Sequence, residues 1–395
     1  MTAENSTSKH PQPLSGIRVL DLTRVLAGPY CTMILADLGA EVVKVEQPDV
    51  GDDARQFGPF LPSGISGYFS SINRGKKSIA LNLKEAADKQ TFLQLAKQAD
   101  IIVENFRPGT MDSLGIGFES LKELKPDLIC VSLSGFGHSG TQQGRPAYDI
   151  VVQALSGLMS ITGEPQGGFV RVGTSISDLL TGLYGVIAVL SALQHRNQSG
   201  AGTVCDLAML DCTVSALENA LCRFAVTGQN PAPLGTRHPS ITPFQAFPTA
   251  DASIVIAAGN QTLWRKLCEI LKAPQLIDDP KLSTNDLRTE NIEYLDECLI
   301  PILKTQPQAY WLSEMESVGI PSAAIRTVDQ VVADDHLQDR QMLHEMDDGS
   351  GGSFVTAGSP LRMNSASPKL STHAPQLGEH TAEILESWLG DESNG

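Results

Sequence analysis

The sequence predicts an α/β fold in which helices cover both faces of a mostly parallel β-sheet. In the first half of the chain, short apolar runs rich in Val, Ile and Leu alternate with helix-length segments. This alternation is typical of a sheet whose parallel strands are joined through helices. The length of 395 residues is sufficient for two domains, or for one large domain that carries a smaller inserted one.

The predicted elements begin near residue 17 and keep this order as far as residue 137. Strands are expected where the short apolar runs lie, and helices where apolar residues recur at helical spacing. The expected strands are residues 17–23, 41–46, 77–83, 100–106 and 128–137, and the expected helices are residues 28–39 and 85–99.

The second half of the chain is less regular. Residues 228–248 contain five prolines and no helical period, which predicts a linker or a loop over a site. A smaller unit of strand and helices is expected from residue 253 to 322. A return to β structure near residues 351–363 and an acidic helix at residues 381–390 follow. Residues 1–13 are expected to form a disordered lead.

The composition limits the classes of function. A net charge of -16 disfavours a nucleic-acid partner, because phosphate binding needs a basic surface. The apolar runs are expected to be too short or too interrupted to span a membrane. The first residues lack the apolar stretch of a secretory signal, so we expect a cytoplasmic protein. Seven cysteines without a CxxC pair are expected to be reduced thiols.

Asp178 is the one acidic residue in the long apolar segment 171–196. The segment is hydrophobic nearly all round, which predicts a buried core helix. One interpretation makes Asp178 the N-terminal cap, so that Asp178→Ala would cost about 1 kcal/mol. The other makes it a catalytic carboxylate, placed where Gly173, Gly182 and Gly185 let a substrate or another backbone approach closely. The pattern alone leaves both open.

Two further motifs carry groups suited to an anionic ligand. In "ENFRPG" at residues 104–109, Phe106 can stack on a planar ring while Asn105 and Arg107 form hydrogen bonds to an anionic cofactor. The alternative is a capped turn with a solvated arginine. "NRGKKS" at residues 73–78 reads as a solvated charge run or as a phosphate clamp.

Arg237 and His238 lie on the proline-rich loop and are either surface residues or a pair that holds a carboxylate substrate. Several other kinds of site are not indicated. The eight histidines are dispersed and no HExxH or calcium-loop pattern occurs, so no metal is expected. GxxxxGK[ST] and GxSxG are also absent, which disfavours a P-loop and a serine hydrolase.

Taken in order, these segments resemble the class III (CaiB/BaiF) CoA-transferases. The resemblance runs from Leu14 to Thr381 and rests on "LSGIRVLDLTRVLAGPYCTMILADLGAEVVKVE", "NRGKKSIALNL", "ADIIVENFRPGTMDSLG", "SLSGFGHSG", "PAYDIVVQALSGLMSITG", "RVGTSISDLLTG" and "GAGTVCDLAMLD". It implies a Rossmann-like large domain built from both chain ends, a smaller α/β domain, and an interlocked homodimer. In this numbering the large CoA-binding domain covers 14–228, a linker and small domain cover 229–323, and 324–395 completes the large domain.

The resemblance also implies roles for individual residues. The nucleophilic aspartate of the family falls on Asp178. A CoA thioester is then a substrate, and no permanently bound cofactor is implied. The family's contacts to CoA fall on Ala27, Leu81, Asn82, Lys84, Asn105, Phe106, Arg107 and Tyr148.

The implied reaction moves CoA from an acyl-CoA, either acetyl-CoA or succinyl-CoA, to a carboxylic acid. It proceeds through an aspartyl anhydride and an aspartyl-CoA thioester. Arg237 and His238 would hold the distal carboxylate of the acceptor, for which we expect oxalate or a C4 to C5 dicarboxylate. The N–H groups of the local glycines or of the loop near Gly235 are candidates to stabilise the oxyanions.

Three departures bear on the substrate. Leu26 stands where members that handle oxalate and formyl-CoA have Gln, and Ser113 where they have Arg. The glycine-rich covering loop of formyl-CoA transferase is missing. "LGTRHPSITPF" and "GFGHSG" look more like acetyl-CoA:oxalate and succinyl-CoA-dependent dicarboxylate CoA-transferases.

Two alternatives stay open. A 2-methylacyl-CoA racemase of the same fold needs a proton acceptor on each side of the α-carbon. Tyr148 stands at the position of the racemase histidine, which disfavours this alternative. The other is a non-catalytic protein that binds acyl-CoA, which would show no turnover and no dependence on Asp178.

Overall fold

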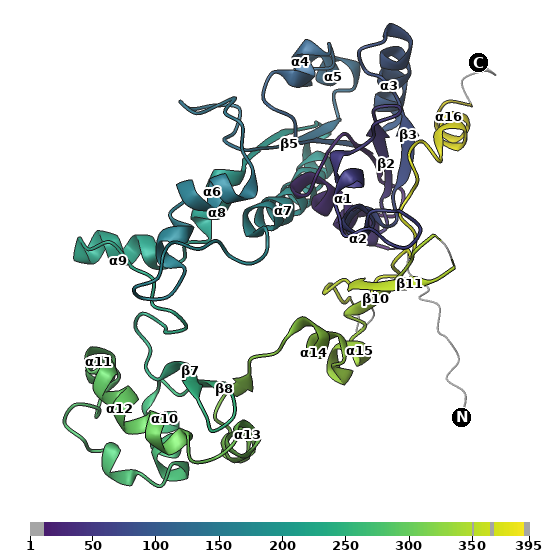
Figure 1. The fold of residues 1–395 in the computed structure, drawn as a ribbon. Helices are drawn as coiled ribbons and strands as arrows, with labels where there is room; N and C mark the ends of the chain where they lie inside the picture. Colours follow the sequence, from purple (N-terminus) through teal and green to yellow (C-terminus); the bar gives the residue numbers. More distant parts are fainter. Residues whose placement is uncertain (1–11, 350, 364–366, 391–395) are drawn as a thin grey trace. The chain divides into compact units, whose positions relative to one another are not determined.

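The computed structural model describes residues 12–349, 351–363 and 367–390, so most of the expected lead lies outside the described residues. The chain divides into two compact units (Figure 1). Unit 1 comprises Met1–Leu158, Arg171–Cys222 and Asp334–Gly395, and unit 2 comprises Met159–Val170 and Arg223–Ala333. The domain boundaries expected from the sequence stay a prediction.

Unit 1 is built on a six-stranded parallel sheet, as the alternation of elements predicts. The strand order is β3-β2-β1-β4-β5-β6. The chain therefore runs outward from β1 to β3 and then crosses back to β4, which makes the β1/β4 junction the switch point where α/β sheets bind ligands. The strands are β1 (Arg18–Asp21), β2 (Glu41–Glu46), β3 (Lys77–Ala80), β4 (Ile101–Glu104), β5 (Ile129–Ser134) and β6 (Val204–Ala208).

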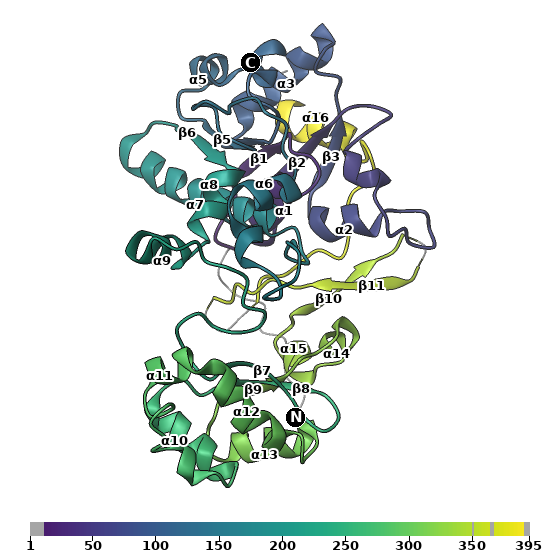
Figure 2. The same ribbon diagram turned by 60° about the vertical axis from the view of Figure 1, so that its left-hand side comes forward.

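Successive residues of these strands enter two different cores. Leu20, Val43 and Ile102 pack under α3 (Ala86–Gln98), α5 (Phe118–Leu124) and α16 (Thr381–Leu389). Their neighbours Val19 and Val42 face α1 (Ala27–Asp37) and α7 (Ile176–Ser199) on the other side. Figure 2 shows the two helical layers with the sheet between them. Because both faces are covered, the strands read as continuous apolar runs rather than as an alternating pattern.

Helix α7 packs one face on α1 and the sheet, and leaves the other open. Gly182, Gly185 and Val189 are in contact with α1 or buried. Leu183 and Ile187, on the opposite side, are 43% and 57% exposed. The expectation that this helix is buried all round is therefore wrong, because a single layer of partners covers only half of its circumference in this chain.

The expectation about membrane-spanning length is also wrong for α7. Its 24 residues are long and apolar enough to cross a membrane by length and composition, and 44% of the most apolar window is buried. Core helices of soluble proteins meet the same criterion. The buried face of α7 contributes Val186 and Val189 to the core beneath the sheet, which identifies it as a packed helix of unit 1.

The end of the chain returns to unit 1. β10 (Leu343–Asp347) and β11 (Ser353–Ala357) form an antiparallel hairpin, and the predicted acidic helix is α16. The segment before α16 reaches the edge strand β3, where the His380 N–H donates to the Ser78 carbonyl at 2.9 Å.

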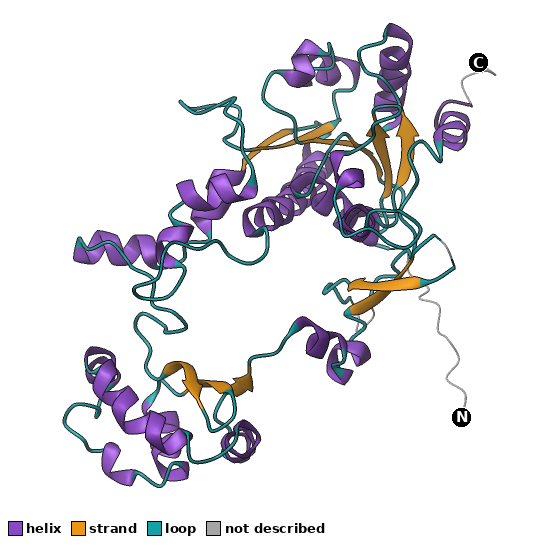
Figure 3. Cartoon of the chain, in the orientation of Figure 1, coloured by secondary structure: helices purple, strands orange, loops and turns teal. Residues whose placement is uncertain are grey.

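Unit 2 has its own core around a small antiparallel sheet (Figure 3). Its strands are β7 (Phe244–Pro248), β8 (Ser253–Ala257) and β9 (Ser322–Ala324), in the order β7-β8-β9. Trp264 of α10 (Gln261–Ile270) and Trp311 of α13 (Gln308–Ser317) are buried against this sheet, together with Leu295 of α12 (Ile292–Leu303). The proline-rich segment thus ends in a strand rather than remaining a loop to residue 248.

Candidate active site

A pocket of about 390 Å³ opens at the carboxyl edge of the parallel sheet, where the strands end and the loops begin. The turn after β1 contributes Arg24 to Ala27, and the turn after β4 contributes Asn105 to Pro108. Residues 144–148, which precede α6 (Asp149–Leu155), form another wall. Asp178 reaches the pocket from the first turn of α7.

Asp178 is the third residue of α7, and its carboxyl group has a strongly raised pKa. Its carboxylate accepts a hydrogen bond from the backbone N–H of Ala27. Partial burial and, second to it, the nearby charge of Asp149 together raise the pKa of this carboxyl to about 7, against the lowering effect of the Ala27 bond. An acid in a cleft with a pKa this strongly perturbed is a candidate for chemistry.

Asp178 is not the cap of its helix, contrary to the capping interpretation. The N-cap position is Ser175, whose side chain makes no capping bond. Asp149 instead accepts from the Ser177 N–H at 2.9 Å with one carboxylate oxygen. Its other oxygen accepts from Gln153 Nε2 at 2.7 Å. Because a carboxylate from α6 satisfies this terminus, that of Asp178 is free to face the pocket.

The glycines of α7 make room for helix α1 rather than for a substrate. A Cβ atom added at Gly182 would lie 2.8 Å from the carbonyl oxygen of Ala27. One added at Gly185 would lie 2.9 Å from the sulfur of Cys31 on the same helix α1. Gly173 has nothing within 4 Å of such an atom. Gly182 and Gly185 therefore let α1 approach α7 closely, and this approach places the Ala27 N–H on Asp178.

The residues that the resemblance associates with CoA lie mostly around two adjoining pockets. Ala27, Asn105, Arg107, Tyr148 and Phe106 line the pocket of Asp178. Asn82, Lys84 and again Phe106 line a second pocket of about 140 Å³ at the ends of β1 and β2. Leu81 lines neither, because its side chain is buried in the core and its N–H donates to the Glu46 carbonyl.

A family model described as CoA-transferase family III matches residues 14–381. The acetyl-CoA:oxalate CoA-transferase of Acetobacter aceti is 40% identical to this chain over 392 residues, which cover 99% of both proteins. The succinyl-CoA:mesaconate CoA-transferase of Haloarcula hispanica is also 40% identical, covering 96% of this chain and 98% of that protein.

The chain belongs to CoA-transferase family III. It is thus an enzyme of the CoA-transferase class, whose substrates are CoA thioesters. Its fold is similar to that of the crystal structure of a CaiB/BaiF family protein from Brucella suis. The two are 36% identical with a TM-score of 0.85, over 96% of this chain and all of the other. No cluster of three metal-ligating side chains occurs in the part of this family III chain that the structure describes.

Both interpretations of "NRGKKS" are wrong in this family III protein. Arg74 is buried and paired with Asp37 at 2.6 Å. Lys76 is buried and paired with Asp21 at 3.0 Å. Lys77 is bound by two acids on the surface of the sheet. All three cations are thus paired within the protein, and only Lys77, whose side chain is 31% exposed, keeps contact with solvent. The motif is therefore neither a phosphate clamp nor a run of solvated charges.

Arg237 and His238 line a separate pocket within unit 2, together with Thr242 and Thr289. The His238 ring packs on Phe244 with 5.5 Å between ring centroids. Arg237 lies within electrostatic reach of Asp296, whose carboxylate accepts from Gln245 Nε2 at 2.7 Å. The N–H of Gly235 itself donates to the Gly163 carbonyl at 2.8 Å, so this one group is already used. The expectation that other N–H groups of this loop or of the local glycines serve an oxyanion stays a prediction.

Three residues of the site were not predicted from the sequence. Arg24 and Arg145 line the Asp178 pocket with Arg107, so three arginines meet at one pocket of an acidic protein. Tyr68 of α2 (Gly67–Asn73) lies close enough to Asp178 that the carboxylate helps burial to raise the pKa of the phenol to about 12. No local pattern marks these residues, because their elements meet Asp178 only in the folded chain.

Proposed function

We propose that Asp178 is the nucleophile of CoA transfer from an acyl-CoA to a carboxylic acid. The observation that carries this proposal is a half-buried carboxylate at the wall of the pocket, which lies beside the Ala27 N–H and has a pKa raised to about 7. At neutral pH a substantial fraction of the Asp178 carboxyl groups is ionised and can attack as a nucleophile. The Ala27 N–H beside this carboxylate can stabilise negative charge on its oxygens during the reaction.

The transfer proceeds in four substitutions at carbonyl carbon. An oxygen of Asp178 attacks the acyl-CoA carbonyl, the C–S bond breaks, and CoA leaves as the thiolate with an aspartyl anhydride formed. The thiolate attacks the aspartyl carbonyl and releases the donor acid, which leaves an aspartyl-CoA thioester. The acceptor carboxylate then displaces CoA, and the thiolate attacks the acceptor carbonyl of this second anhydride and restores Asp178. A carboxylate is a weak nucleophile, so the rate depends on positioning.

The charges around the pocket suit a CoA thioester. Arg107 and Arg145 offer donors to phosphate oxygens, and Lys84 lies at the adjoining pocket. Arg24 lines both pockets and is paired with Asp53 at 2.5 Å. Phe106 lines both pockets and offers its ring for stacking on the base of the nucleotide. We therefore propose that CoA extends across the two pockets with its thioester toward Asp178.

The acceptor we propose is oxalate or a C4 to C5 dicarboxylate, with acetyl-CoA or succinyl-CoA as donor. The relatives from Acetobacter aceti and Haloarcula hispanica act, by name, on oxalate and mesaconate, both of which carry two carboxylates. Arg237 and His238 share a pocket of about 230 Å³ in unit 2 and provide donors for a distal carboxylate.

The proposal includes a homodimer in the cytoplasm. The open face of α7 presents Leu183, Ile187 and Leu190, each more than 40% exposed, which is more apolar surface than one helix of a monomer usually leaves to water. A second copy of the chain would cover it, as the resemblance implies.

The cysteines support the proposed cytoplasmic location. All seven cysteines are free thiols, in keeping with a reducing compartment.

Mass spectrometry of the protein incubated with succinyl-CoA or acetyl-CoA tests the chemistry. We expect an aspartyl-CoA adduct that maps to Asp178, that hydroxylamine converts to a hydroxamate, and that Asp178→Asn abolishes while the fold is retained. An absence of adduct together with exchange of label at the α-carbon would instead support the racemase. Binding with neither signal would contradict transfer from these two donors.

A further inference from the structure

The turn Thr23–Val25, which connects β1 to the pocket, adopts a costly backbone conformation. Val25 has a φ of 68°, in the left-handed region that β-branched residues rarely occupy. Residues in such a region persist only when their surroundings hold them there, and they cluster at functional sites. Leu26, which follows, is the N-cap of α1, and Ala27 begins the helix and donates to Asp178.

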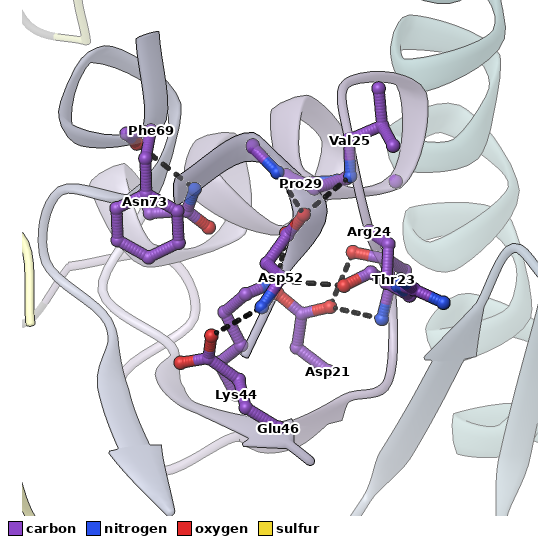
Figure 4. Close-up of polar contacts among 12 residues, drawn as sticks. Asp21, Thr23, Arg24, Val25, Pro29, Lys44, Glu46, Asp52, Phe69 and Asn73 are labelled. Atoms are coloured by element: carbon purple, nitrogen blue, oxygen red, sulfur yellow. Dashed lines mark hydrogen bonds and ion pairs between the residues drawn. The ribbon is translucent and has the colours of Figure 1, made fainter. Parts of the chain in front are cut away.

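Side chains, rather than the backbone of a neighbouring strand, satisfy the polar groups of this turn. The Thr23 N–H donates to Asp21 at 2.8 Å, and the Thr23 carbonyl accepts from Lys44 Nζ at 2.6 Å. Asn105 binds both the N–H and the carbonyl of Arg24, each at 2.8 Å. The Val25 N–H donates to Asp52 at 2.9 Å. Figure 4 shows this arrangement around Asp52 and Lys44.

The two central groups form a buried ion pair. Lys44 Nζ lies 2.8 Å from Asp52 Oδ2, and both side chains are at most 1% exposed. The pair therefore bonds to both ends of the turn at once, at the Thr23 carbonyl and at the Val25 N–H. A pair this deeply buried is a weak source of stability, because desolvation offsets most of its attraction. The position of the pair is better explained by the conformation that it imposes on the turn Thr23–Val25.

We propose that Asp52 and Lys44 are positioning residues that hold Val25 in the left-handed conformation and thereby keep the Ala27 N–H on Asp178. This inference rests on the proposed role of Asp178. Neither side chain lines the pocket of Asp178, although Asp52 lines the adjoining one. Loss of the clamp therefore lowers the rate of the covalent step even when acyl-CoA is saturating.

The test compares two variants that differ in one hydrogen-bond acceptor. Lys44→Met with Asp52→Asn removes the charges but keeps an oxygen for the Val25 N–H. Lys44→Met with Asp52→Ala removes that oxygen as well. We expect adduct formation in single-turnover experiments at saturating acyl-CoA to be at least tenfold slower in the second than in the first. Equal rates would overturn the proposal.

Val25→Gly separates positioning from general damage. Glycine adopts a positive φ without the cost that valine bears, so the clamp is needed less. Placed in both double variants, Val25→Gly should reduce the tenfold difference to threefold or less. A difference that persists would mean that Asp52 acts otherwise, for example through its bond to the Ala54 N–H.

Asp37→Asn is the matched control, because it breaks another buried pair, with Arg74, at the far end of α1. It should lower the melting temperature without changing the rate of adduct formation by the folded fraction. A comparable slowing in this variant would overturn the proposal. If the wild-type protein forms no adduct on Asp178, the proposed function fails, whereas an adduct that forms equally fast in both clamp variants refutes the clamp alone.

Discussion

The carboxyl group of Asp178 is half-buried and lies near the charge of Asp149, and both conditions disfavour its ionised form. Its pKa is 3.8 as the ordinary value and about 7 in the folded protein. The protonated form therefore favours the fold, with a contribution that is fully present below pH 4 and lost as the pH rises through 7.

Asp178→Asn should consequently stabilise the protein at pH 8 while it abolishes transfer. The neutral amide escapes the cost of burying a charge, and we expect a gain of roughly 1 to 4 kcal/mol in the free energy of unfolding, since one pKa unit corresponds to about 1.4 kcal/mol. Urea unfolding at pH 4 and pH 8 measures it. A loss of stability at pH 8, as expected for a removed cap, would contradict this account of Asp178.

The pH dependence of adduct formation should report the same carboxyl group. The rate should rise through a midpoint near pH 7, because only the ionised form attacks. Glu104 is also buried, with a pKa near 7, so a midpoint alone does not identify the group. Asp149→Asn removes a charge that acts on Asp178, whereas Asp206 is the charged neighbour that raises the pKa of Glu104. This variant should shift the midpoint to lower pH, and an unchanged midpoint would assign it to Glu104.

Helices α1 and α7 meet through glycine, so their contact is sensitive to a single methyl group. Gly182→Ala would place a Cβ atom 2.8 Å from the Ala27 carbonyl oxygen, a backbone atom that cannot rotate away. We expect a loss of about 1 to 3 kcal/mol in stability together with slower adduct formation, because α1 must shift and carry the Ala27 N–H with it. Denaturant unfolding and single-turnover rates measure the two effects.

Gly173→Ala provides the control for this contact. A Cβ atom there meets nothing within 4 Å. Its stability should stay within about 0.5 kcal/mol of the wild type, as for most exposed substitutions. Equal effects at both glycines would show that the approach of α1 to α7 is not the cause.

The molecule as a whole leaves one face of α7 uncovered, and the proposed homodimer explains it. Ile187→Glu places a charge at the most exposed apolar position of that face. We expect the mass measured by analytical ultracentrifugation to fall from that of a dimer to that of a monomer, whereas Ile187→Leu should leave it unchanged. A wild-type chain that sediments as a monomer would contradict the proposed assembly.

Arg237, on the proline-rich loop, yields a prediction about substrate recognition. If Arg237 holds the distal carboxylate of the acceptor, Arg237→Ala should raise the acceptor KM tenfold or more and the donor KM by less than threefold. Steady-state kinetics with each substrate varied in turn measures the ratio. An equal rise in both constants would refute the assignment.

The sequence by itself determined the strand alternation, the family and Asp178 as the outstanding candidate, because periodicity and motifs depend on residues close together in the chain. Only the tertiary structure decided how the charges are used. The cations of "NRGKKS" are bound by Asp21, Asp37 and Glu41, which precede them by more than 30 residues. The cap of α7 likewise comes from Asp149, 28 residues before the group it binds. A buried charge takes whichever partner the fold brings within 3 Å, and no local pattern specifies which partner that is.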